Sequence, residues 1–377
     1  MFFRKIMKQN MTQAPIVYQS GTNVKLIHKA EYCKSIIADG KELITGNESG
    51  PLSVPELKDE KVYITFKEDV TDLSNAFYRC ALLTSIPENL FANNPEVTIF
   101  EETFSLCTAL TEIPENIFAN CPEVTSFFQA FHDCSALTSI PEKLFANNPK
   151  VTNFAYTFHA CDALTVIPEN LFAHNPKVTD FDDTFSSCRA LISIPEKLFA
   201  NNPEVISFNA TFVICSLLTS IPEKLFANNI KVTDFESTFR FTALTSIPEN
   251  LFANCPKVTV FGGTFSECKA LIAIPKGLFV HNPKVTDFEQ TFDGCEALKS
   301  IPTSLFDNNR KVTSFSETFY GCTSLTGESP YTMIDGQKVH IYERQNYPEH
   351  FTAPTNSKYT FKSCTGLTDY DQIPSWK

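Results

Sequence analysis

The stretch from residue 80 to residue 107 reads CALLTSIPENLFANNPEVTIFEETFSLC, and the same pattern then begins again. As a consensus it is C-x-x-L-x-x-I-P-x-x-L-F-x-x-N-P-x-V-T-x-F-x-x-T-F-x-x-C. Every step between successive Ile-Pro pairs is 27 residues, except one of 26. A fixed period of this length is the signature of a solenoid, in which each repeat stacks on the next. The Ile residues of these pairs are Ile86, Ile113, Ile140, Ile167, Ile194, Ile221, Ile247, Ile274 and Ile301.

Phenylalanine accounts for 35 of the 377 residues, and most of it falls into three columns with the same period. Side chains that recur at a fixed interval lie over one another once the coils stack, so we expect a continuous hydrophobic spine. A lone repeat leaves both faces of its apolar side chains open, so the units should be stable only as an array. The three columns run from Phe91 to Phe306, from Phe100 to Phe315 and from Phe104 to Phe319.

Each coil is expected to combine short strands with short arcs. Residues 83–86 and 97–100 are rich in β-branched side chains and should form parallel strands against the neighbouring coils. Residues 88–93 and 101–107 should form brief helical or 3-10 arcs, and Pro87 suits the first turn of such an arc.

One coil is a residue short. The missing residue falls between Phe239 and Leu244, where the Cys of the pattern is also lost. We therefore expect a local dent in an otherwise regular stack.

The repeat pattern also indicates where the solenoid begins and ends. Before it, Val62, Ile64 and Phe66 alternate with polar neighbours, which predicts a strand that caps the stack. After it, Asp335-Gly336 stands between two alternating runs and predicts a β-hairpin. The expected parts are an N-terminal segment with a small β-rich module and capping strand (residues 1–69), the solenoid (70–325), a hairpin insertion (326–360) and a terminal partial repeat that acts as a cap (361–377).

Composition and charge exclude some classes of protein. The net charge of −12 makes nucleic acid a poor partner, because binding to a phosphate backbone rests on clustered Lys and Arg. The sequence contains no run of about 18 or more apolar residues, so it predicts no transmembrane segment. Residues 1–12 carry Arg4, Lys5 and Lys8 without a following apolar stretch, which is not how a secretory signal is built. The protein then stays in the cytoplasm, leaves by another route, or lacks its leader in this sequence.

The unit VTDFDDTFSSC at residues 178–188, followed by Leu191, resembles the BspA-like leucine-rich repeats of bacterial surface proteins. Those repeats run as a Val-Thr segment, an aromatic residue or Met, a Phe, and then Cys-x-x-Leu. The resemblance spans residues 70–325 and returns at 361–377. It implies adhesion to host or matrix proteins, display at the cell surface and protein interaction, with no cofactor and no catalytic residues. The terminal hairpin and broken last repeat are also similar to chains of gut Bacteroidetes and their phages, so a virion protein is a further setting.

The predicted fold is therefore an α/β repeat solenoid. It is a right-handed leucine-rich-repeat coil with short parallel strands, short helical or 3-10 arcs, and about nine repeats of 27 residues.

A Cys column follows the same period. A metal or redox ladder is one interpretation, but the spacing lacks Cys-x-x-Cys pairs and no His recurs beside it. Small buried thiols that fill space beside Phe and Leu are the favoured interpretation, and Cys121 and Cys255, which replace Asn in their coils, belong with them. The column consists of Cys80, Cys107, Cys134, Cys161, Cys188, Cys215, Cys268, Cys295 and Cys322.

Two polar groups have competing interpretations as well. The acidic residues Asp180, Asp182 and Asp183 raise a calcium hypothesis, but neighbouring coils offer Asn153 and Ser207, so a solvated edge is favoured and no metal is expected. An Asn column either forms a recognition face or satisfies turn backbone groups from coil to coil, and the second is favoured. This column consists of Asn94, Asn148, Asn175, Asn202, Asn229, Asn282 and Asn309.

A binding surface should lie where the repeat varies most, in the pair of residues between the second Phe and the Thr-Phe. Phe128 and Tyr156, with His132 and His159 nearby, form an aromatic group in adjacent coils and are the first candidate for a hot spot. A second candidate is the hairpin region, whose alternative role is to cap the open end of the stack. Its candidate residues are Tyr331, His340, Tyr342 and Tyr347.

Catalysis finds no support, because the chain has no His-Glu-x-x-His, no Gly-x-Ser-x-Gly and no Gly-rich phosphate loop. We therefore predict a non-enzymatic binding or adhesion protein without cofactor or metal. It would recognise a protein or glycan on a bacterial surface or phage particle. The alternative is a structural spacer rod without a specific ligand.

Overall fold

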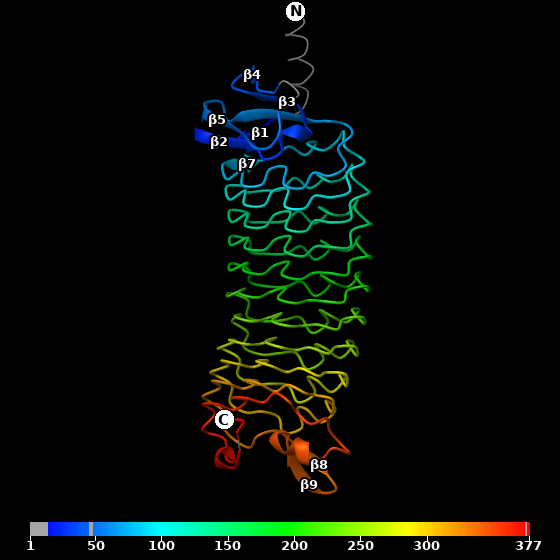
Figure 1. Cartoon of the computed structure of the whole chain (residues 1–377), viewed down its shortest axis with the longest axis vertical. Coiled ribbons are helices and arrows are strands. Elements are labelled where there is room, and N and C mark those ends of the chain that lie inside the picture. Colours follow the sequence, from blue (N-terminus) through cyan, green and yellow to red (C-terminus); the bar gives the residue numbers. More distant parts are fainter. Residues whose placement is uncertain (1–13, 45–47, 374) are drawn as a thin grey trace, which may run out of the picture. The chain divides into compact units, whose positions relative to one another are not determined.

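The computed structural model describes residues 14–44, 48–373 and 375–377, and the prediction about residues 1–12 lies outside them. The chain divides into two compact units, each described by itself. Unit 1 comprises residues 1–178 and 188–190, and unit 2 comprises residues 179–187 and 191–377. In both, the chain is wound into successive coils (Figure 1). In the described residues no helix is long and apolar enough to cross a membrane.

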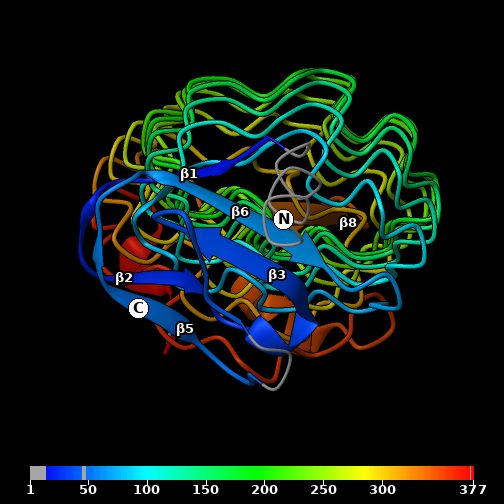
Figure 2. The same cartoon turned by 90° about the horizontal axis from the view of Figure 1, so that it is seen from above.

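Unit 1 begins with a β-rich module that covers its first coil. Strand β6 lies between β3 and β1 (Figure 2). Strand β1 also pairs with β7, which belongs to the first coil. At the end of β6, Phe66 lies 6.1 Å from Phe77 and 5.6 Å from Phe91, measured between ring centroids, so it continues the apolar core of the coils. The elements are β1 (Ile16–Tyr18), β2 (Gly21–Ile27), η1 (Ala30–Tyr32), β3 (Cys33–Ala38), β4 (Lys41–Glu42), β5 (Leu52–Leu57), β6 (Lys61–Phe66) and β7 (Leu83–Ser85).

The Phe columns are stacked inside both units, as the period predicts. In unit 1, Phe91 and Phe118 lie 6.1 Å apart with an interplanar angle of 7°. In unit 2, Phe199 and Phe226 lie 6.2 Å apart at the same angle. Of the 27 rings in the three columns, 26 are 0% exposed and Phe306 is 1% exposed, so the hydrophobic spine within each unit is dry. The leucine-rich-repeat solenoid is thereby confirmed at the level of fold class.

The local structure of a coil is simpler than predicted, because the described coil residues form turns and no α-helix. The strand expected at residues 83–86 is present as β7, but it pairs antiparallel with β1. The parallel strands expected near residues 97–100 are single bridges, such as Ile99 with Ser126 in unit 1 and Ser207 with Asp234 in unit 2. The expected arc at 101–107 is a pair of turns in which Glu102 and Leu106 have positive φ angles of 52° and 61°. A residue with positive φ breaks a right-handed helix, which is why no helix forms there.

An Asn ladder runs through the interior, so the second interpretation of the Asn column holds. Asn282 Nδ2 donates to the carbonyl oxygens of Phe252 (3.1 Å) and Cys255 (2.9 Å) in the preceding coil. Where Cys255 takes the place of Asn, its thiol lies 3.8 Å from Phe226 O, in the position of a weak donor. All seven Asn side chains are buried, which removes them from any recognition face.

The Cys column is a ladder of buried free thiols. Cys134 Sγ donates to Phe104 O at 3.3 Å, and Cys295 Sγ donates to Phe265 O at 3.2 Å. All 13 Cys of the chain are buried, and each is a thiol that takes no part in a disulfide. Burial raises the pKa of the Cys188 thiol to about 12, so the reactive thiolate is disfavoured at neutral pH.

In the coil that is one residue short, Thr242 takes the place of the missing Cys. Its side chain is 4% exposed and occupies the Cys position, 3.2 Å from Cys268 Sγ. Thr242 Oγ1 also donates to Phe239 O at 2.8 Å. Phe241, with φ at 59°, is 41% exposed, so the predicted irregularity appears as an outward ring beside an intact spine.

Unit 2 ends in a cap built from the hairpin and the last partial coil. The predicted turn is present, with Asp335 and Gly336 at φ angles of 50° and 80°. Arg344 is 1% exposed and donates through Nη1 to Asn309 O (2.9 Å) and through Nη2 to Phe306 O (2.8 Å). These are the carbonyls that the next Asn of the ladder would meet, so Arg344 ends the ladder. The elements are β8 (Tyr331–Ile334), β9 (Gln337–His340), η2 (Ile341–Asn346) and η3 (Tyr370–Gln372).

The Asn ladder can be tested by comparing Asn282→Leu with Asn282→Cys. Leu removes the amide N–H donor that Asn282 supplies to Phe252 O and Cys255 O. This loss should lower the unfolding free energy by about 1–3 kcal/mol. Cys retains a weak donor, as the chain itself does at Cys255, and should cost less. Urea unfolding followed by circular dichroism measures both, and equal losses in the two variants would contradict the proposed role of the amide.

Candidate functional site

The candidate surface is the face of each coil that contains the two positive-φ turns. On this face alternate backbone N–H groups donate to the next coil, from Glu102 to Phe128 O (2.9 Å), from Phe104 to Ala130 O (2.8 Å) and from Leu106 to His132 O (2.7 Å). These bonds hold neighbouring coils in a fixed register, so side chains at equivalent positions lie beside one another. We call this surface the turn face.

The structure brings together the four residues of the first predicted group, all of them in unit 1. Phe128 and Tyr156 form an edge-on ring pair with centroids 5.8 Å apart, and His132 and His159 stack at 4.9 Å. Tyr156 and His159 lie 5.6 Å apart and link the two pairs. All four side chains are half-buried. We call these residues the aromatic–histidine cluster.

Tyr156 occupies a position that is unfavourable for a bulky residue. Its φ is 56°, in the left-handed region, where a side chain costs about 1–2 kcal/mol relative to glycine. The chain does place glycine at the equivalent position of another coil, where Gly263 has a φ of 61°. Eight of the nine coils carry a residue other than glycine at this position, so the conformation is a feature of the coil and the ring is what distinguishes Tyr156.

Two half-buried imidazoles make the cluster sensitive to pH. Burial lowers the pKa of His132, and His159 lowers it further by charge repulsion. Burial likewise lowers the pKa of His159, opposed by the carboxylate of Asp133. Ser105 Oγ lies 3.4 Å from His132 Nδ1 and helps to orient that ring. Both rings are therefore neutral at pH 7, and the cluster presents uncharged aromatic faces.

The second predicted group lies in the terminal cap of unit 2. His340 is stacked against Tyr342, with centroids 5.1 Å apart, and contacts Tyr331 edge-on at 5.5 Å. His340 and Tyr342 are only 9% and 7% exposed, whereas Tyr331 and Tyr347 are half-buried. The two buried rings serve the interior of the cap and are not available to a partner in this structure.

The cap also contains a Ser, His and Asp in mutual contact, which invites comparison with a nucleophilic triad. Ser329 Oγ lies 2.8 Å from His340 Nδ1 and donates to Asp369 Oδ2 at 2.5 Å. A nucleophile must reach its substrate and be deprotonated by the imidazole. Ser329 is 0% exposed and its hydroxyl is engaged by a carboxylate, so this group is a buried polar network.

The acidic residues that raised the calcium hypothesis are held by protein groups. Asp182 Oδ1 accepts hydrogen bonds from Ser207 Oγ (2.5 Å) and from the backbone N–H of Asn209 (3.0 Å). Burial raises the pKa of Asp182 to about 7, a change that favours a protonated acid over a metal ligand. In the described part of the chain, no three His, Cys, Asp or Glu residues converge as metal ligands.

The repeating coil, the Phe spine and the Asn ladder define the class of protein as a leucine-rich-repeat solenoid. No family model and no curated protein matches the sequence. Among solved structures, the chain is similar to a leucine-rich repeat protein from Bacteroides ovatus, with 20% identity over 82% of this chain and 70% of that chain and a TM-score of 0.38.

Two further solved structures show the same kind of similarity. One is a leucine-rich cell surface protein from Faecalibacterium prausnitzii, with 22% identity over 82% of this chain and 80% of that chain and a TM-score of 0.36. The other is the leucine-rich repeat domain of the type III effector XopL, with 16% identity over 64% and 63% of the two chains and a TM-score of 0.30. The fold assignment rests on this chain's own geometry.

The imidazole pair predicts a loss of stability in mild acid. Both pKa values are lowered from the ordinary 6.5, so the unfolded chain binds more protons than the folded one once pH falls below that value. The stability from the neutral pair is complete above pH ~6.5 and is lost as pH falls toward the folded-state pKa values. Urea midpoints measured between pH 7.5 and 5.5 should fall less in the double variant His132→Gln/His159→Gln than in the parent chain. Parallel pH profiles in the two proteins would refute the idea.

Proposed function

We propose that this chain is a non-enzymatic binding protein whose aromatic–histidine cluster recognises a protein or glycan ligand. The observation that carries the proposal is the convergence of four rings on the turn face of unit 1, with Phe128 against Tyr156 and His132 against His159. Half-exposed aromatic side chains supply large contact areas, and Tyr and Trp are among the residues that dominate binding energy at interfaces.

The placement of the Tyr156 ring adds support. The ring contacts Phe128 and His159 and stays partly open to solvent, so one of its faces is left for a partner. The rigid backbone ladder beneath it also limits the entropy lost on binding, because the rings are already in place.

The setting that we propose is the surface of a bacterium or of a phage particle. It rests on the resemblance of the repeats to those of bacterial surface proteins, and adhesion is the activity that such a setting suggests. A spacer rod differs from this proposal in one respect, because a spacer needs no particular side chains on the turn face.

The test replaces the exposed rings in the double variant Phe128→Ser/Tyr156→Gly. Glycine relieves the left-handed backbone at residue 156 and so limits the loss of stability. The parent chain should bind selectively on an array of glycans and purified extracellular-matrix proteins, and the variant should lose at least about tenfold in affinity for the same targets.

A matched control is Glu115→Ser/Lys143→Ser, which changes two exposed side chains outside the turn face of unit 1. It should bind as the parent chain does. Selective binding that survives in Phe128→Ser/Tyr156→Gly would place the ligand elsewhere, and a parent chain that binds nothing on the array would favour the spacer.

A further inference from the structure

A cavity opens on the turn face of unit 2 where one coil has glycine at both variable positions. In the other eight coils this pair carries side chains, whereas here it is Gly262 and Gly263. The hollow has a volume of about 250 Å³, and both glycines are buried beneath it. A Cβ on Gly262 would meet Glu289 O at 3.6 Å and Glu236 Cγ at 3.7 Å, which is ordinary contact. The space is therefore created by missing side chains and could be filled without a clash.

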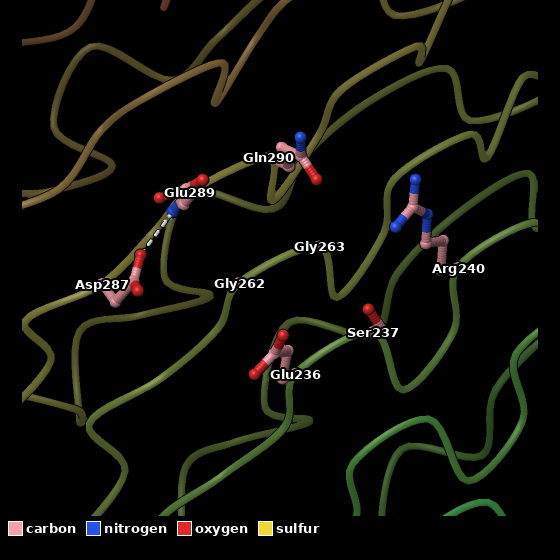
Figure 3. Close-up of a pocket in the computed structure, with 8 residues that line it drawn as sticks. All are labelled: Glu236, Ser237, Arg240, Gly262, Gly263, Asp287, Glu289 and Gln290. Atoms are coloured by element: carbon pink, nitrogen blue, oxygen red, sulfur yellow. Dashed lines mark hydrogen bonds between the residues drawn. The ribbon is translucent and has the colours of Figure 1, made fainter. Parts of the chain in front are cut away.

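Charged groups of opposite sign line two sides of this cavity. The carboxylates of Glu236 and Glu289 flank Gly262 from the two neighbouring coils, with Asp287 beside Glu289, and the guanidinium of Arg240 lies beyond Gly263 (Figure 3). In the described part of the chain, none of these four groups forms an ion pair. Arg240 also attracts the carboxylate of Asp293, which lies outside the cavity lining, so the three carboxylates of the lining are the charges left to engage a ligand.

The carboxylate side is held in place by neutral donors. Asp287 Oδ1 accepts from the backbone N–H of Glu289 at 2.7 Å. Glu289 Oε2 accepts from Ser314 Oγ at 3.3 Å and from Asn356 Nδ2 at 3.2 Å. These bonds fix the direction of the acceptors while leaving their charge uncompensated. Burial raises the pKa of Glu236, and the neighbouring Asp234, Asp287 and Glu289 raise it further, which is the effect of a negative potential.

The cationic side of the cavity is the guanidinium of Arg240. It lies 5.0 Å from the Phe241 ring centroid, and because its Nε is buried, the terminal nitrogens are the donors that a ligand could meet. An arginine fork offers several N–H donors to a carbonyl or carboxylate. A ligand that carries a cation on one side and an acceptor on the other would match both sides of the cavity.

We propose that this cavity binds a basic residue of a polypeptide partner. The ammonium or guanidinium of a Lys or Arg lies against Glu236, Asp287 and Glu289, and a backbone carbonyl of the same segment accepts from Arg240. Three carboxylates against one guanidinium give the cavity a negative potential that repels an anionic ligand. The presence of Arg240 beside the carboxylates distinguishes the cavity from a surface edge lined by acidic residues alone. The site lies in unit 2 and is independent of the aromatic–histidine cluster.

The test titrates the full chain with Nα-acetyl-lysine N-methylamide, followed by saturation-transfer NMR. Binding should be saturable and should weaken as NaCl rises from 50 to 500 mM. The uncharged probe Nα-acetyl-norleucine N-methylamide, which has a side chain of similar length, should bind at least about tenfold more weakly. Free lysine should bind no more tightly than the blocked probe.

Three variants locate the site. Gly262→Leu fills the cavity and should abolish saturable binding, whereas Asn209→Leu, at the equivalent position two coils earlier in unit 2, should leave it unchanged. Glu236→Gln keeps the size of the side chain, removes one charge and should weaken binding roughly tenfold. Circular dichroism and urea unfolding verify that each variant is folded, which is expected because other coils carry large side chains at residue 262's position.

Several results would overturn the proposal. Equal binding of the norleucine probe would remove the role of charge, and undiminished binding in Gly262→Leu would move the site elsewhere. Tighter binding of free lysine than of the blocked probe would identify a free amino acid in place of a polypeptide residue.

Discussion

Within each unit the structure depends on one constraint, which is that alternate peptide groups on the turn face point along the stacking direction. Their N–H groups donate to the next coil, as Phe104 does to Ala130 O in unit 1 and Phe239 does to Thr264 O in unit 2. The coil that is one residue short keeps these bonds, because Phe239 and Phe241 still donate to Thr264 O and Ser266 O, so the register of the turn face is maintained there too. The Phe spine, the Cys column and the Asn ladder are consequences, because equivalent side chains are brought to lie over one another.

The exceptions show what each column requires. Cys255 replaces Asn, Thr242 replaces Cys, and Arg344 stands where the ladder ends, yet each places a donor group near a buried acceptor. A buried carbonyl without its donor is costly, so the physical requirement is for a donor at that point more than for a particular residue type. The same register serves function on the outside, where it sets His132 beside His159 and leaves a hollow beside Glu236.

The period alone was enough to predict the solenoid, the buried Phe columns and the contact between His132 and His159, because all three follow from residues 27 positions apart lying side by side. The hairpin at Asp335-Gly336 was predictable from local turn chemistry. The arcs were not, because positive φ at residues such as Glu102 and Leu106 is imposed by hydrogen bonds to the next coil and has no signal in their side chains. The burial of His340 and the role of Arg344 at the end of the ladder could not be predicted either, because both depend on how the cap folds back on the last coil. The same holds for the charges around Gly262, which come together from three coils.

Amide hydrogen exchange measures the central constraint most directly, because it reports on each backbone N–H. The account predicts slow exchange for the N–H groups of Glu102, Phe104 and Leu106 and their equivalents in later coils, although these residues lie in neither helix nor strand. Exchange at the rate of an unfolded chain in these segments, with the β-strands of the N-terminal module still protected, would contradict it.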